Sequence, residues 1–352
     1  MTDIYQKLAK HLDRLPAGFP ATETGVELRI LKRLFSEEEA AIAMSLTMLA
    51  ETPADIAQKL DRSVDDLAPV LEKMARKGLV FRSTRGGQNK YSAAQFVVGI
   101  WEYHVNDLSE DLVRDMNEYI PHLMKKSWIK HPTKQLRVVP VTQSVSAEMK
   151  VMPYDQAEEI INSQSKIVVA PCICRREHEL IGEGCGKLME ACLIFGASAY
   201  YYEENQLGRA ISQDEAREIL NQGLADGLVL QPGNSRKPSN ICLCCGCCCQ
   251  ILKNLKTLDK PARVVSTSWV AMADEDNCTA CEVCVDRCQM DAITVDDYAH
   301  VDPDRCIGCG LCVPTCEYEA MTLREIDSVN HYVPPRNTVA TYLNLARDRG
   351  LI

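Results

Sequence analysis

Through the first third of the chain, apolar residues recur every three or four positions, the period of helices that bury one face. Ser36 and Glu39 have the spacing of a capping box and predict the start of a helix over 40–49. Thr52 predicts the next start, because Pro53 stands at its first helical position. The residues before this pattern, 1–22, read as a short helical arm that ends among prolines and a glycine.

A third helix and a pair of strands follow. The helix begins after Ser63, carries apolar residues at helical spacing and ends at Gly78. Strands are predicted over 79–84 and 90–94, joined by a turn that contains two glycines. The order helix, helix, helix, hairpin resembles that of winged helix-turn-helix domains, which predicts a winged-helix-like domain over 23–96.

Three further parts are predicted from the pattern alone. Residues 97–134 are amphipathic and predict connector helices. Residues 135–270 alternate between strand and helix, which favours a small α/β domain. Residues 326–352 form a tail that ends in a helix over 339–349. The fold class expected for the whole chain is multidomain α+β.

Eighteen cysteines in 352 residues are the outstanding feature of the composition. The N-terminus is charged from its third residue, and no run of eighteen apolar residues occurs, so we expect no signal peptide, no membrane span and a cytoplasmic protein. The cysteines stand in tight clusters within a long chain. This arrangement favours metal ligation over disulfides.

Eight of the cysteines form an internal repeat. They are Cys278, Cys281, Cys284 and Cys288, then Cys306, Cys309, Cys312 and Cys316. This spacing resembles that of bacterial ferredoxins with two [4Fe–4S] clusters, over residues 274–325 of a domain expected at 271–325. The resemblance implies that Cys278, Cys281, Cys284 and Cys316 hold one cluster, and that Cys306, Cys309, Cys312 and Cys288 hold the other.

The repeat departs from that family at two positions. Gln289 and Glu317 stand where family members usually have the proline that follows the fourth cysteine. Proline is not a ligand, so the departure concerns the rigidity of the loops and the cluster potentials. Zinc is the alternative occupant, but zinc motifs seldom carry a third cysteine at this spacing.

The other ten cysteines precede the repeat. They are Cys172, Cys174, Cys185 and Cys192, then Cys242, Cys244, Cys245, Cys247, Cys248 and Cys249. The CxCR and CxCCGCCC segments resemble those of a largely uncharacterised group of Cys-rich iron–sulfur proteins of anaerobes, over about 160–325. The resemblance implies at least one further iron–sulfur cluster, held by a subset of the ten.

Spacing leaves that subset open. Cys185 and Cys192 could be buried as small apolar side chains, the latter in a core helix over 191–199. If 242–249 is extended, Cys242 and Cys244, or Cys245, Cys247 and Cys249, could converge on one centre. His178, close behind the CxC pair, is expected to be solvated.

The negative charge is concentrated in the repeat. Thirteen acidic and three basic residues lie between Asp274 and Glu325, so this segment carries a net charge of −10, equal to that of the whole chain. Such a surface repels nucleic acid and attracts basic patches on proteins.

These features favour an electron-transfer protein of anaerobic metabolism, with a redox protein or an oxidoreductase complex as its partner. The alternatives are an iron–sulfur reductase with an active-site cluster in the Cys-rich domain, and a redox-sensing winged-helix regulator. We find no pattern that identifies catalytic residues.

For the N-terminal domain, docking of a protein, including a second copy of this chain, is favoured over DNA binding. The predicted wing offers Arg82, Arg85 and Lys90 to phosphate, but Asp65 and Asp66 begin the helix that would enter the groove.

Overall fold

The structure is a computed structural model that describes residues 3–145, 149, 151–326 and 331–352. The chain divides into two compact units. Unit 1 comprises residues 1–133, 197–209 and 342–352, and unit 2 comprises residues 134–196 and 210–341. This division differs from the pattern along the chain, which places 197–209 in the Cys-rich domain and 342–352 in a tail.

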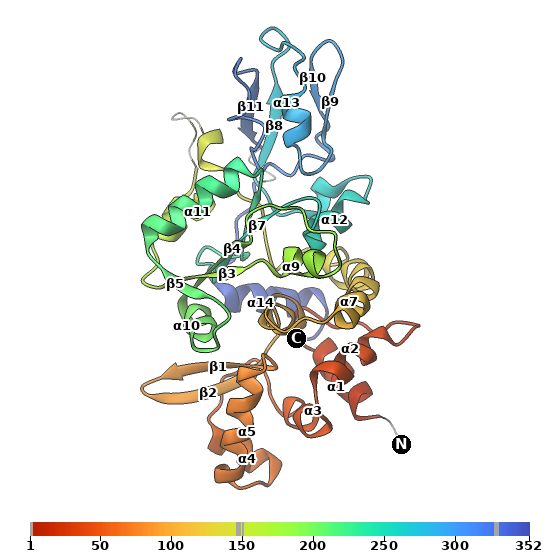
Figure 1. The fold of residues 1–352 in the computed structure, drawn as a ribbon, viewed down its shortest axis with the longest axis vertical. Coiled ribbons are helices and arrows are strands. Elements are labelled where there is room, and N and C mark those ends of the chain that lie inside the picture. The colour runs from red at the N-terminus through yellow and green to blue at the C-terminus, as the bar shows by residue number, and fades with distance from the viewer. Residues whose placement is uncertain (1–2, 146–148, 150, 327–330) are drawn as a thin grey trace. The chain divides into compact units, whose positions relative to one another are not determined.

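Unit 1 contains the predicted helices and hairpin of the N-terminal region (Figure 1). Its first elements are α1 (Ile4–Asp13), α2 (Val26–Leu34), α3 (Glu37–Ala43), α4 (Pro53–Leu60), α5 (Val64–Arg76), β1 (Val80–Arg85) and β2 (Gln88–Ala93). The capping box at Ser36 is confirmed, and Thr52 forms a second one with Asp55. Ser63 precedes α5, but its side chain forms no capping hydrogen bond.

The connector region also folds within unit 1. It consists of η1 (Phe96–Ile100), α6 (Trp101–Tyr103), α7 (Glu110–Leu123) and η2 (Met124–Trp128). The apolar face of α7 is buried, with Met116 and Tyr119 fully inaccessible, and the helix packs against α2. The predicted connector is therefore part of a helical core.

The hairpin formed by β1 and β2 does not offer Arg82 to a ligand. The Arg82 side chain is 3% exposed and forms ion pairs with Glu72 at 2.5 Å and Glu204 at 2.7 Å. A guanidinium between two carboxylates has no free donor face for phosphate, so the expectation for Arg82 is wrong. Lys90 remains partly exposed, and the Arg85 side chain lies outside the described part of the chain.

The acidic partner Glu204 comes from α10 (Gly196–Glu204), far along the sequence. The phenol of Tyr201, also on α10, donates to the carbonyl oxygen of Ala75 at 2.7 Å. Residues 197–209 therefore close over the hairpin and the end of α5. Within unit 1, the last turns of α14 (Thr338–Asp348) lead to Arg349, which donates to the carbonyl oxygen of Leu15 at 2.6 Å.

Unit 2 is built on a five-stranded sheet in the order β5-β3-β4-β7-β6. The strands are β3 (Ile167–Pro171), β4 (Glu190–Phe195), β5 (Arg209–Ile211), β6 (Val229–Pro232) and β7 (Asn240–Cys244). The pairs β3–β4, β4–β7 and β6–β7 are antiparallel. Cys192 lies on β4 and pairs with Cys242 on β7, so the alternative that placed it in a core helix over 191–199 does not hold.

Helices accompany this sheet, and two of them begin beside cysteines. They are η3 (Thr142–Ser144), η4 (Pro153–Asp155), α8 (Ala157–Asn162), α9 (Ile173–Leu180), α11 (Gln213–Ala225), α12 (Gln250–Lys256) and η5 (Pro261–Val264). Helix α11 packs on β3, β4 and α8. Helix α9 begins directly after Cys172, and α12 begins directly after Cys249.

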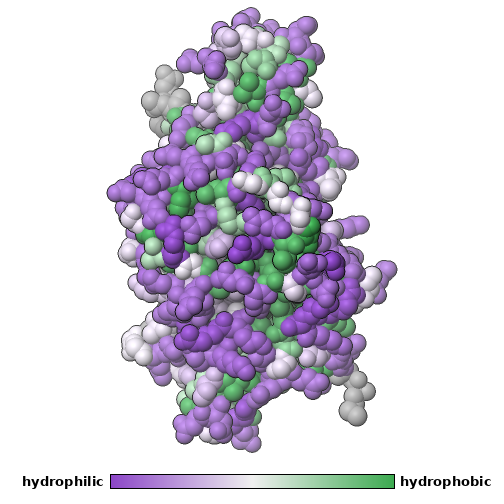
Figure 2. All heavy atoms as spheres, viewed as in Figure 1, coloured by the Kyte–Doolittle hydropathy of each residue, from purple (hydrophilic) through white to green (hydrophobic). Residues whose placement is uncertain are grey.

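The C-terminal part of unit 2, residues 269–325, contains the ferredoxin-like cysteine repeat and is called the ferredoxin module. It consists of β8 (Trp269–Ala273), α13 (Val283–Arg287), β9 (Ile293–Val295), β10 (Ala299–Val301) and β11 (Met321–Glu325), in which β8 pairs with β11 and β9 with β10 (Figure 1). Trp269 and Met321 are each 2% exposed at the centre of its core. Figure 2 shows hydrophobic residues among hydrophilic ones on its visible face, at the top of the view. Among the described helices of the chain, none has the length and apolarity needed to cross a membrane.

Candidate iron–sulfur centres

Both cysteine loops of the ferredoxin module turn through left-handed backbone at matching positions. In the first loop these are Ala280 at φ 52° and Glu282 at φ 64°, and in the second Gly308 at φ 67° and Gly310 at φ 73°. Left-handed residues allow a short loop to curl so that its thiols face inward. The repeat that is visible in the cysteine spacing therefore extends to the backbone.

The thiols of Cys278, Cys281, Cys284 and Cys316 line one pocket of the module. Its other walls are formed by Thr279, Ala280, Glu282, Val283, Val295, Ala299, Tyr318, Ala320 and Met321. Burial, together with the charge of the other three thiolates, raises the pKa of Cys284. Four thiols with few other polar groups in their pocket fit an iron–sulfur cluster, which supplies the positive charge that holds thiols deprotonated.

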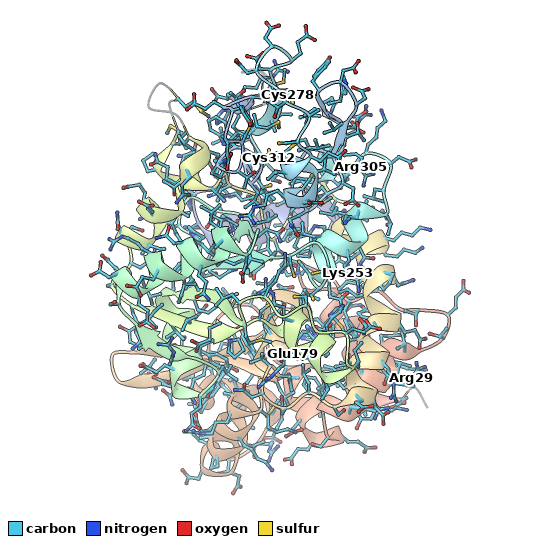
Figure 3. All side chains as sticks on the ribbon, turned by 45° about the horizontal axis from the view of Figure 1, so that its top comes forward. Arg29, Glu179, Lys253, Cys278, Arg305 and Cys312 are labelled. Carbon is cyan, nitrogen blue, oxygen red and sulfur yellow. The ribbon has the colours of Figure 1, made fainter. Side chains whose placement is uncertain are left out.

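A second set brings Cys288 from the first loop to Cys306, Cys309 and Cys312. Burial raises the pKa of Cys309 to about 12, with the Cys288 and Cys306 thiolates adding to the shift. Backbone N–H groups already point at sulfur: Ala271 donates to Cys306 at 3.4 Å and Ala292 to Cys288 at 3.3 Å. Buried thiols with N–H donors aimed at them are suited to cluster ligation. Figure 3 places Cys312, of this set, and Cys278, of the first set, within the same module.

In the Cys-rich domain, four of the ten cysteines form a compact tetrathiolate group. The Sγ atoms of Cys185, Cys245, Cys247 and Cys248 all lie within 4.8 Å of one another. Metal–sulfur bonds of about 2.3 Å place the thiolates of a tetrahedral ion about 3.8 Å apart, so the group as it stands fits one iron or zinc ion. A cubane requires the same side chains to swing outward, because each then ligates a different iron.

The remaining six form a second, more extended set, the six-cysteine group. Its members are Cys172, Cys174, Cys192, Cys242, Cys244 and Cys249. Thiol contacts link Cys172 to Cys174, and Cys174 to Cys249. Further contacts link Cys249 to Cys244, and Cys244 to Cys242. The Sγ atoms of Cys242 and Cys192 are 4.0 Å apart across the two paired strands.

Hydrogen bonds lower the pKa of two thiols in the six-cysteine group. The Cys174 thiol lowers the pKa of Cys172 to about 7, with Arg175 assisting. The thiols of Cys174 and Cys244 hold the pKa of Cys249 well below its usual range, helped by N–H groups at the start of α12. Donation from neighbouring groups stabilises the thiolate, the form that binds metal.

Arg175 lies between the two groups and is 1% exposed. Its guanidinium donates to the carbonyl oxygens of Leu188 at 2.6 Å and Leu243 at 2.8 Å, while its Nε has no partner. Burial alone would lower the pKa of Arg175, but the thiolates of Cys172, Cys245 and Cys244 raise it. The fourth residue of the CxCR segment is thus a buried cation among thiols, a role that the spacing of the cysteines does not indicate.

The prediction for His178 is wrong. The residue is 4% exposed, with Nδ1 2.7 Å from the carbonyl oxygen of Cys174 and Nε2 3.0 Å from Nζ of Lys253. Its position one helical turn after Cys174 on α9 turns the ring toward the protein. Strand alternation groups Cys249 with Cys245 and Cys247. In the structure Cys249 lies with the six-cysteine group instead, because the chain turns between residues 245 and 248.

The ferredoxin module contacts the Cys-rich domain at the residue that replaces the usual proline. The backbone N–H of Gly246 donates to Oε1 of Gln289 at 2.7 Å, and a Cβ at Gly246 would collide with the Gln289 carbonyl oxygen. Gly246 stands between Cys245 and Cys247, and Gln289 follows Cys288. One hydrogen bond therefore joins a ligand loop of the module to the tetrathiolate group.

Two arginines hold the same joint by binding helix ends. Arg287 donates to the carbonyl oxygens of Leu224 and Ala225 in the last turn of α11. Arg305 donates to those of Lys256, at the end of α12, and Leu258, at 3.2 and 3.0 Å. Cations are favourable at these ends, where helix carbonyls lack partners. Figure 3 labels Arg305, which belongs to the module.

Comparison with known proteins adds one match. The family described as 4Fe-4S binding domain matches residues 299–322, which contain Cys306, Cys309, Cys312 and Cys316. No curated protein matches, and no solved structure matches. The segment from Ala299 to Thr322 thus carries an iron–sulfur binding domain, in agreement with the ferredoxin pattern read from the second half of the repeat.

Proposed function

We propose that this chain is an iron–sulfur electron-transfer protein that exchanges low-potential electrons with a redox partner and relays them into its own Cys-rich domain, in the service of an oxidoreductase of anaerobic metabolism. The observation that carries the proposal is the hydrogen bond between Gln289 and Gly246, which links the two cysteine-bearing parts.

The pocket and the contacts described above support the ligand sets that the ferredoxin resemblance implies. Cys278, Cys281, Cys284 and Cys316 hold one cluster, and Cys288, Cys306, Cys309 and Cys312 hold the other. Such clusters take up and release single electrons. The crossing of Cys288 and Cys316 between the loops keeps the two sets adjacent, so the loss of one ligand is expected to disturb both.

The tetrathiolate group is the proposed third iron centre. One connection to it runs from Cys288 through one peptide bond to Gln289, along the Gln289 side chain and across its hydrogen bond to Gly246, and through one more peptide bond to Cys245 or Cys247. Electron transfer slows steeply with distance, so a joint with a direct hydrogen bond favours transfer between these loops. The steric demand at Gly246 keeps that contact tight.

The acidic surface suits a basic partner protein. Of the three basic residues in the segment 274–325, Arg287 and Arg305 bind helix ends in the joint. The exposed part of the module is therefore more acidic than its composition alone suggests. The N-terminal domain, whose wing has lost Arg82 to internal ion pairs, is proposed to dock a protein, including a second copy of this chain.

The test compares two substitutions at matching positions of the repeat. Gln289→Ala removes the acceptor for Gly246, whereas Glu317→Ala changes the exposed residue after Cys316. Both should keep the iron and labile sulfide of the wild type, since neither side chain offers a thiolate. After rapid mixing with a low-potential reductant, Gln289→Ala should slow the phase in which the Cys-rich domain is reduced, and Glu317→Ala should not.

Two results would contradict the proposal. One is a Gln289→Ala protein with full iron content in which the Cys-rich domain is reduced at the wild-type rate. The other is an iron content of no more than eight per anaerobically purified chain, the content of two cubanes, with no metal at the tetrathiolate group.

A further inference from the structure

We infer that the six-cysteine group is a metal centre of its own, distinct from the tetrathiolate group, and that it binds a polynuclear iron–sulfur cluster. The inference deepens the proposed function, because this centre would be the end of the electron path within unit 2. Three observations carry it: the partition of the ten cysteines, the spread of the six thiols, and the environment of those thiols.

The partition comes from the fold. Two of the six stand at the start of α9, two on β7, one on β4 and one before α12. The tetrathiolate group uses the 182–186 loop and the turn after β7. If all ten cysteines bound one centre, the adjacent residues Cys244 and Cys245 would both be its ligands. Their thiols contact different neighbours instead: Cys242 and Cys249 for Cys244, and Cys247 for Cys245.

The spread of the thiols argues against a single ion. Among the described residues, the four tetrathiolate cysteines are the group of ligand atoms within 4.8 Å of one another; no three of the six meet that condition. The six are linked in a row instead, from Cys172 through Cys249 to Cys192. One tetrahedral ion cannot reach thiolates arranged in this way, whereas several bridged irons can. Six thiolates also exceed the four that one cubane uses.

The residues around the six thiols can balance the negative charge of several thiolates. Arg175 is buried at 1% exposure with an unpartnered Nε, and within the described residues it forms no ion pair with a carboxylate. A buried cation requires a counter-charge, which thiolates supply. Two amides also donate to sulfur: Nδ2 of Asn240 to Cys242 at 3.4 Å, and Nε2 of Gln231 to Cys249 at 3.8 Å. Donors of this kind hold cluster ligands and tune them.

Dithiol chemistry is the alternative for these residues. Cys192 and Cys242 face each other at 4.0 Å, close enough to oxidise to a disulfide after a small shift. A dithiol pair, however, needs two cysteines and no buried counter-cation. The remaining four thiols, two of which (Cys172 and Cys244) interact with Arg175, have no role in that account.

The experiment separates the two groups by substitution in the full-length protein, purified and reconstituted without oxygen. Cys244→Ser removes a ligand of the six-cysteine group, Cys247→Ser removes one of the tetrathiolate group, and a third variant carries both changes. Ile241→Val is the control, because it alters the buried core of the same strand without removing a thiol. Iron, labile sulfide and the Mössbauer spectrum are measured for each.

Cys244→Ser should lose iron and labile sulfide together with one spectral component. Cys247→Ser should lose a different component, and the losses should add in the combined variant, while Ile241→Val matches the wild type. Equal losses in both single variants and in the combined one would show one centre and overturn the inference. So would a Cys244→Ser protein with undiminished iron and sulfide. These readouts do not involve Gln289, so the relay can fail while this centre stands.

Discussion

At the scale of single residues, Arg175 is the side chain on which the Cys-rich domain depends most. Its guanidinium holds the carbonyl oxygens of Leu188 and Leu243, and so ties the loop before β4 to the middle of β7. The same cation faces thiols of both cysteine groups. Because these are charge-assisted bonds in a buried setting, they contribute more than neutral ones.

Replacing Arg175 by methionine is therefore expected to lower the free energy of unfolding by about 3 kcal/mol, from the loss of two such bonds. The neighbouring Arg176 is the matched control, since it is exposed and pairs with Glu179 at 3.6 Å on the surface. Arg176→Met should cost less than about 0.5 kcal/mol. Denaturant unfolding without oxygen measures both, and equal midpoints for the two variants would contradict the role given to Arg175.

At the scale of elements, the two cysteine loops share a backbone but differ in what surrounds them. Ala280 and Gly308 occupy the same position and are both left-handed. A Cβ at Gly308 would collide with the carbonyl oxygen of Trp269 on β8. Ala280 already carries a Cβ at its position and is partly exposed. The second loop therefore contacts β8 closely at Gly308, whereas the first loop has room for a side chain at the matching position, Ala280.

Placing alanine at 308 and glycine at 280, in separate variants, should have unequal effects. Gly308→Ala combines left-handed strain with a backbone collision, and we expect a loss of about 3 kcal/mol and of the iron bound by the second loop. Ala280→Gly relieves the left-handed strain of the folded loop but increases the conformational freedom of the unfolded chain. Its effect on the free energy of unfolding should therefore stay within about 1 kcal/mol. Unfolding midpoints and iron per chain test the pair; a Gly308→Ala protein with full iron and wild-type stability would refute the comparison.

At the scale of the whole molecule, the charge is unevenly distributed along the chain. The segment 274–325 accounts for a net charge of −10, and the rest of the chain sums to zero. Two of the three basic residues in that segment are engaged in the joint. A partner that approaches the module therefore meets a negative surface, and its encounter is steered by a field that salt screens.

Electron delivery to a small basic acceptor protein should consequently slow by about tenfold or more between about 0.01 and 0.5 M ionic strength. A neutral small-molecule acceptor should show little change over the same range, because no field steers it. Stopped-flow measurement of both rates provides the test. Identical salt dependence for the two acceptors would mean that the acidic surface does not guide the partner.

The sequence by itself determined the features that rest on local geometry. Helix starts at Ser36 and Thr52 follow from side chains that reach backbone groups three residues away. The ferredoxin repeat is likewise readable, because a loop that wraps a cluster needs its thiols at short, regular spacing. The match over 299–322 agrees with that pattern.

Only the tertiary structure decided which distant residues meet. Cys185 joins cysteines sixty positions away, and Cys192 pairs across strands with Cys242. Arg82, which looks like a phosphate contact in sequence, is enclosed by carboxylates from α5 and α10. Spacing along a chain fixes neither strand pairing nor burial, because both depend on packing between segments that are remote in sequence. The ten central cysteines therefore divide into two groups only once the sheet and the turn after β7 have formed.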